Sequence, residues 1–127
     1  MSLDIDNSTG TIQLYQGDSG SVFVNNLDPQ KSYRVYMAVY DAKRRQVGEE
    51  LMVEAHNVDF VEFVLLSSFT ALFEVPLAKE NETYYYGIKL NEIGTINADT
   101  VFIAGGTYGD LNELIVYPRK VKGYLEV

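Results

Sequence analysis

Cysteine and tryptophan are absent from this chain of 127 residues, and histidine occurs only once, as His56. Without cysteine the chain has no disulfide, no thiolate metal ligand and no cysteine nucleophile. Because zinc sites draw mainly on cysteine and histidine, a zinc centre is close to excluded. The lack of cysteine fits a reducing compartment, or an assembly that is put together in one.

Positive charge is also scarce. Ten Lys and Arg residues stand against eighteen Asp and Glu residues, which gives a net charge of −8 at pH 7. Since nucleic-acid binding needs a basic surface to face the phosphates, we expect no nucleic-acid partner. No apolar run approaches the roughly 18 residues that a membrane-spanning helix needs, so we expect no membrane partner. Residues 1–10 lack the basic start and apolar middle of a signal peptide.

Catalytic motifs are missing as well. His56 falls in an expected turn, where a lone histidine is usually a solvated side chain. There is no nucleophile elbow, and the glycine-rich stretch 105–109 lacks the lysine and the following helix of a phosphate-binding loop. One small domain rarely supplies the cleft across which glycosidase carboxylates face each other. We therefore predict no enzyme activity, no catalytic residue and no cofactor.

Calcium is the metal that the composition leaves open, because it takes carboxylate and carbonyl oxygens. The candidate ligands lie in and beside the glycine-rich stretch: Asp99, Asp110, Asn112 and Glu113. Their spacing is not that of an EF-hand loop. Surface acidic residues are the simpler interpretation, and we predict no metal site.

The sequence does contain a series of short apolar runs, each broken by Gly, Asn, Asp or Pro. This spacing predicts an all-β domain of about eight strands, over 11–15, 21–25, 33–40, 47–53, 58–66, 82–90, 100–104 and 112–117. Short connections and the lack of a long helix favour an antiparallel β-sandwich. A serine-capped helical turn is expected near 68–73. We predict one domain over 1–127, with 1–10 disordered and 119–127 as an edge strand or a tail.

Alternation with a period of two indicates which strand residues face the core. The run 58–66 is apolar enough for a central strand. The residues predicted to lie inward are Val35, Met37, Val39, Val61, Phe63, Tyr84, Tyr86 and Ile88.

Ten tyrosines are the one compositional oddity. Strand propensity alone accounts for most of them. Tyr36, Tyr40 and Tyr85, however, fall on the faces opposite the expected core. Exposed aromatic rows can stack on sugars or become buried against another subunit. We predict that these three tyrosines form an interaction surface.

The order of these features resembles the N-terminal domain of phage baseplate upper proteins. This scaffold family belongs to the tail baseplates of phages and prophages of Gram-positive bacteria. Three segments carry the resemblance: the turn Gln16-Gly17-Asp18-Ser19-Gly20 after the opening strand, the stretch 65–72, and the tyrosine strand 83–90 followed by 99–102 and 114–117.

The resemblance implies an immunoglobulin-like β-sandwich that serves as a structural, non-enzymatic module of a phage tail or baseplate. It implies protein–protein contacts with other virion proteins or with further copies of the chain as a homo-oligomer. It also implies a place in the virion tail after synthesis in the bacterial cytoplasm. One alternative stays open: a carbohydrate- or cell-surface-binding β-sandwich, which would use the exposed tyrosines to bind surface carbohydrate.

Overall fold

The computed structural model describes residues 3–6, 8–101 and 111–118. Strands dominate this part of the chain, and the elements follow in the order β1 (Asp4–Ile5), β2 (Ile12–Tyr15), β3 (Gly20–Val24), β4 (Ser32–Tyr40), β5 (Leu51–His56), β6 (Val61–Leu65), α1 (Ser67–Thr70), β7 (Glu82–Glu92), β8 (Ala98–Val101) and β9 (Asn112–Tyr117). The prediction of a mostly β protein with one helical turn is confirmed. No helix in the described ranges is long and apolar enough to cross a membrane.

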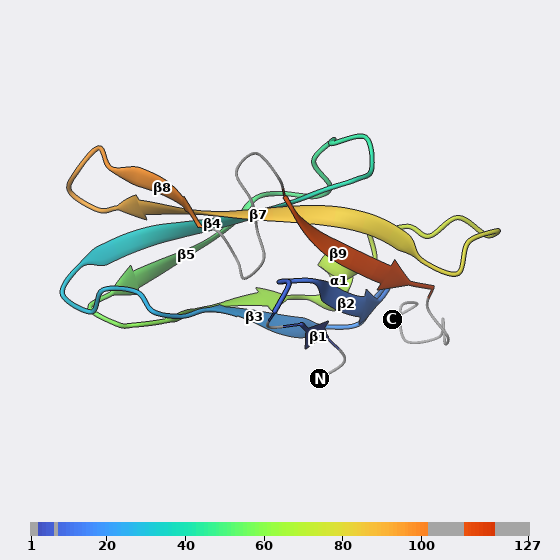
Figure 1. Cartoon of the computed structure of the whole chain (residues 1–127), viewed down its shortest axis with the longest axis horizontal. Coiled ribbons are helices and arrows are strands. Elements are labelled where there is room, and N and C mark those ends of the chain that lie inside the picture. Colours follow the sequence, from blue (N-terminus) through green and yellow to red (C-terminus); the bar gives the residue numbers. More distant parts are fainter. Residues whose placement is uncertain (1–2, 7, 102–110, 119–127) are drawn as a thin grey trace.

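The strands form two sheets. The larger has the order β1–β2–β9–β7–β4–β5, and β8 pairs with β7 along the same edge as β9. The smaller contains β3 and β6, paired antiparallel. Figure 1 shows β3 and β6 across from β4, β5 and β7, while β9 runs obliquely from β7 toward β2. The larger sheet is therefore curled, and the core lies between it and the smaller sheet.

One strand pair is parallel. β2 lies beside β9 with Ile12 opposite Leu114 and Tyr15 opposite Tyr117. Every other pair of strands in the described part of the chain is antiparallel. The expectation of a wholly antiparallel arrangement is thus wrong at this pair. It rested on the lack of a helical crossover, but a parallel pair needs only a long connection, and here most of the domain lies between the two strands.

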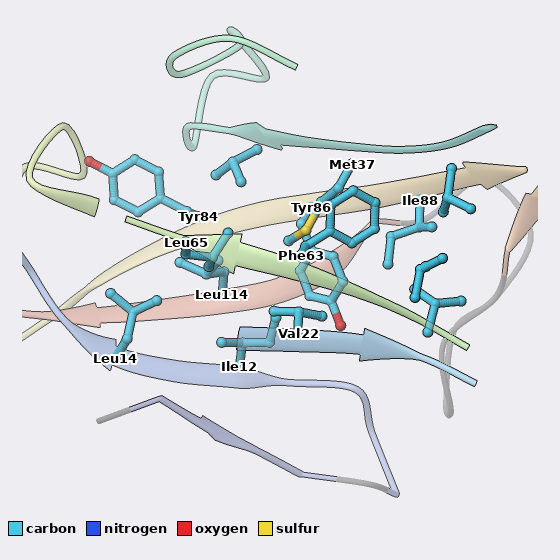
Figure 2. Close-up of a cluster of buried hydrophobic side chains, with 14 of the residues drawn as sticks. Ile12, Leu14, Val22, Met37, Phe63, Leu65, Tyr84, Tyr86, Ile88 and Leu114 are labelled. Carbon is cyan, nitrogen blue, oxygen red and sulfur yellow. The ribbon is translucent and has the colours of Figure 1, made fainter. Parts of the chain in front are cut away.

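Alternation of buried and exposed side chains gives each sheet an inward face. In β6, Val61, Phe63 and Leu65 are buried, whereas Glu62 and Val64 are exposed. The eight residues predicted to lie inward are all buried: Val35, Met37, Val39, Val61, Phe63, Tyr84, Tyr86 and Ile88. They belong to one cluster of buried side chains. Figure 2 shows side chains from both sheets meeting in it.

The short helix α1 is fixed to the turn between β2 and β3. The buried Thr70 hydroxyl donates a hydrogen bond to the carbonyl of Asp18 at 2.8 Å. The side-chain amide of Gln16 donates to the carbonyl of Ala71 at 2.9 Å. The predicted serine cap is wrong, because Leu66 occupies the N-cap position and no side chain caps the helix. Hydrogen bonds to the turn between β2 and β3 thus hold this helix, instead of the local side-chain cap that was expected.

Three other expectations concern the ends and edges of the fold. Strand β1 lies inside residues 1–10, for which the sequence predicts disorder. Strand β6, expected to be central, pairs with β3 alone among the described strands, so it lies in a two-stranded sheet. The glycine-rich stretch 105–109 and the predicted edge strand or tail at 119–127 lie outside the described residues.

Two core tyrosines place their hydroxyls against backbone carbonyls. Tyr86 donates a hydrogen bond to the carbonyl of Gly10, and Tyr84 donates to the carbonyl of Glu74 at 2.6 Å. Burial raises the pKa of Tyr86 to about 12. Burial, followed by the charge of nearby carboxylates such as Glu82, also raises the pKa of Tyr84 to about 12. Both phenols are therefore held in the neutral form by the fold.

The domain is expected to lose stability at high pH through these phenols. The pKa of Tyr86 in the folded state lies above the ordinary value of 10.0. The neutral phenol therefore makes its full contribution to the free energy of unfolding below pH 10.0. This contribution is lost as the pH rises through about 12. A Tyr86→Phe variant loses the bond to Gly10, yet its urea midpoint should fall less than that of the wild type across this pH window. Equal falls in the two proteins would contradict the linkage.

Candidate interaction surfaces

The outer face of β4 and β7 carries the three tyrosines predicted as an interaction surface. Tyr36 and Tyr40 lie on β4, and Tyr85 lies on β7 opposite Tyr40. All three are partly exposed. They point away from the core because their neighbours along each strand, such as Met37 and Tyr86, are buried. The structure therefore places the three side chains on one outward face.

Between Tyr36 and Tyr40 this face is hollowed. Ala38 on β4 lies opposite Gly87 on β7, so the row between the two tyrosines carries almost no side chain. The resulting hollow has a volume of about 190 Å³. Besides these four residues it is lined by Glu50, Ile88, Lys89, Thr100 and Leu111. We call it the tyrosine hollow.

Tyr85 lies outside the tyrosine hollow. The guanidinium carbon of Arg44 lies 4.5 Å from the centre of the Tyr85 ring, which is a cation–π contact. Arg44 comes from the turn that follows β4, where its backbone adopts a positive φ of 65°. The three predicted residues therefore separate into two groups. Tyr36 and Tyr40 line a hollow, whereas Tyr85 packs against the basic turn.

A larger hollow of about 340 Å³ lies at the end of β4, beside the segment that leads into β7. Three of its charged side chains, those of Asp41, Arg45 and Glu82, already have partners. Arg45 Nε lies 3.1 Å from Asp41 Oδ2, and Lys79 Nζ lies 3.2 Å from Glu82 Oε1. Hydrogen bonds from the backbone and side chain of Arg45, among others, lower the pKa of Asp41. The hydroxyl of Tyr84 donates to a backbone carbonyl. The groups named here are therefore already paired.

Four exposed apolar side chains lie on and beside the outer face of the smaller sheet. Phe23 on β3 is 46% exposed and Val64 on β6 is 53% exposed. Phe60 and Leu66, which flank β6, are 47% and 59% exposed and continue the outward alternation. The ring centres of Phe23 and Phe60 lie 6.3 Å apart. We call these four residues the apolar patch. The exposed Glu62 lies opposite Phe23 in the register, within the patch.

Two of the candidate calcium ligands, Asp99 and Glu113, are not brought together. Asp99 pairs with Leu90, on the inward side of β7, whereas Glu113 pairs with Tyr85 on the outward side. Asp110 lies outside the described residues. Within the ranges that the structure describes, no group of three or more His, Cys, Asp or Glu residues is placed to hold a metal ion.

His56 is an exposed residue at the end of β5. Its Nε2 lies 3.0 Å from Glu54 Oε1, and Arg34 Nε donates to the other oxygen of Glu54 at 3.1 Å. The hydrogen bonds from His56 and then Arg34 lower the pKa of Glu54. The histidine thus takes part in a surface network of charged side chains.

No family model matches the chain, and no curated protein matches it. Among solved structures, the chain is similar to the periplasmic chaperone SfaE, with a TM-score of 0.63 and 10% sequence identity. The match covers 90% of this chain and 56% of the chaperone chain, so the present chain corresponds to little more than half of that protein. At this identity the likeness concerns the fold alone. Fold and surfaces together describe a mostly β domain with two distinct outward faces, one tyrosine-lined and one apolar.

Proposed function

We propose that this chain is a non-enzymatic structural module of a phage or prophage tail or baseplate. It is built as an immunoglobulin-like β-sandwich and acts through protein–protein contacts. The observation that carries the proposal is the apolar patch on the smaller sheet. The resemblance of segments 16–20, 65–72 and 83–90 to baseplate upper proteins supports the phage context. The two facing sheets and the likeness to the chaperone support the sandwich.

The apolar patch has the composition of a protein contact. β6 has apolar residues on both faces, with Phe63 in the core and Val64 beside Glu62 on the outer face. Apolar residues on both faces are typical of strands that are buried on both faces. The two phenylalanines of the patch, Phe23 and Phe60, are the kind of large side chain that anchors an interface. Exposed apolar side chains grouped in this way favour an interaction surface.

The expected occupant is a different tail or baseplate protein and not a second copy of the chain. In a two-fold dimer the same patch meets itself, so the Glu62 carboxylates of both copies would enter one apolar contact. Burying such carboxylates without a cationic partner is costly. The net charge of −8 on each copy adds repulsion over a longer range. A partner that presents Lys or Arg to Glu62 avoids both costs.

The proposal is tested with purified tail and baseplate proteins encoded beside the gene for this chain. Binding of the wild-type domain is measured by calorimetry and by sedimentation. A Phe23→Ser/Val64→Ser double variant should bind at least about tenfold more weakly, because truncating central interface anchors often costs 2 kcal/mol or more, roughly. Both side chains are partly exposed, so the fold should survive the change.

The matched control is Met52→Ser/Leu77→Ser, which removes two exposed apolar side chains away from the patch. It should leave binding unchanged. Equal losses in both double variants would contradict a contact at the apolar patch. A chain that binds none of the neighbouring tail proteins, or that forms dimers through the patch, would contradict the proposed partner.

A further inference from the structure

The tyrosine hollow is built by the register of three strands. One wall is a cross-strand row in which Tyr36 on β4, Lys89 on β7 and Thr100 on β8 lie opposite one another in turn. The floor is Ala38 opposite Gly87. Ala38 is only 6% exposed although it faces outward, because larger side chains stand on both sides of it. Alanine and glycine, the two smallest residues, thus lie opposite each other at the floor of the hollow.

The floor leaves little room for a side chain at Gly87. A Cβ atom added to Gly87 would lie 3.1 Å from Leu111 Cδ2. Leu111 lines the end of the hollow on the β7 side, and Glu50 lines it on the β5 side. The hollow is therefore a short trough across the strands, with an apolar end and an acidic end.

The polar groups of the trough have no partners in the described part of the chain. No hydrogen bond or ion pair there involves the side chains of Tyr36, Tyr40, Glu50, Lys89 or Thr100. In the charged hollow at the end of β4, by contrast, Arg45 pairs with Asp41, and Glu82 pairs with Lys79. Polar groups that surround a hollow and do not pair with one another remain available to a ligand.

The chemistry of these groups indicates a neutral ligand rich in hydroxyls. Glu50 accepts hydrogen bonds, Lys89 donates them, and Thr100 can do both. One negative and one positive side chain offset each other, so neither an anion nor a cation is favoured. The rings of Tyr36 and Tyr40 offer apolar faces with polar tips. A pyranose ring has the matching form, with C–H groups on its faces and hydroxyls around its edge.

We propose that the tyrosine hollow is a saccharide-binding site for a neutral hexopyranose unit of a cell-surface polysaccharide. Its volume of about 190 Å³ is below the range of roughly 300–1,000 Å³ for drug-sized ligands, which fits one sugar unit of a longer chain. The open trough lets the polysaccharide continue beyond the bound unit. The site lies on the larger sheet and the apolar patch on the smaller one, so this inference does not depend on the proposed tail contact.

The test is an NMR titration of the ¹⁵N-labelled domain with methyl glucoside, methyl galactoside and methyl N-acetylglucosaminide, and with methyl glucuronide as the anionic comparison. At least one neutral sugar should shift the backbone amides of Ala38 and Gly87 at millimolar concentration, without shifting those of Phe23 and Val64. The glucuronide should bind more weakly. A purified cell-wall polysaccharide should shift the same amides. Absence of shifts at Ala38 and Gly87 with every neutral sugar would overturn the proposal.

Two variants locate the binding. Ala38→Leu fills the floor while keeping both tyrosines, and it should weaken sugar binding at least tenfold. Tyr36→Ser/Tyr40→Ser should do the same by removing the stacking rings. Tyr85→Ser is the matched control, because it removes a tyrosine from the same face but outside the hollow, and it should keep the wild-type affinity. Unchanged sugar binding in Ala38→Leu would overturn the site, as would variants of the hollow that impair only tail-protein binding.

Discussion

Truncation of Phe63 to alanine is expected to destabilise the domain by roughly 3–5 kcal/mol, the usual penalty for removing a buried phenylalanine. Phe63 is 1% exposed and projects from the smaller sheet into the core shared with the larger sheet. Figure 2 shows it among side chains that come from both sheets. It is the largest fully buried side chain that the smaller sheet contributes. The midpoint of urea unfolding, followed by circular dichroism, measures the loss.

Val64→Ala is the matched control for Phe63→Ala. It changes the next residue of the same strand, whose side chain is 53% exposed on the outer face. Its cost should stay within about 0.5 kcal/mol, as for most surface substitutions. A large loss for Val64→Ala and a small loss for Phe63→Ala would show that the register of β6 is inverted, because a shift of one residue exchanges the two faces.

The inward faces could be predicted from the sequence because they depend on a local pattern. Val35, Met37 and Val39 alternate with arginine, tyrosine and alanine over a strand of nine residues, and no tertiary information is needed to group them. The pairing of β2 with β9 could not be predicted in this way. Residues 12–15 and 112–117 are far apart in the sequence, and the local pattern of each strand is the same whether its neighbour runs parallel or antiparallel.

The two candidate surfaces also differ in how far the sequence alone predicts them. The sequence places Tyr36 and Tyr40 on an outward face, but the hollow between them requires Ala38 to lie opposite Gly87. That register between β4 and β7 is a property of the folded sheet. The residues of the apolar patch on and beside β6 belong to the apolar run 58–66. From the sequence, this run predicts a central strand. In the structure β6 has one strand neighbour among the described residues, so the same apolar residues form a surface.

Substitution of Gly48 by alanine is the second change with a large expected effect. Gly48 has a φ of +70°, and a Cβ atom added there would lie 2.6 Å from Phe69 Cε1 and 3.2 Å from Leu72 Cδ1. The left-handed backbone costs a non-glycine residue about 1–2 kcal/mol, and forcing a packed neighbour aside costs about 1–3 kcal/mol more. Reduced freedom of the unfolded chain offsets less than about 1 kcal/mol. We expect a net loss of roughly 2–4 kcal/mol.

Gly94→Ala separates the two causes of that loss. Gly94 has a φ of +90°, but no atom lies within 4 Å of an added Cβ, so alanine there meets backbone strain without a steric clash. Its urea midpoint should therefore fall less than that of Gly48→Ala. Displacing the Phe69 ring would disturb its edge-on contact with the buried Phe73, whose ring centre lies 5.1 Å away. Equal losses for the two variants would mean that Phe69 yields without cost, and that the contact between the segment after β4 and α1 contributes little to stability.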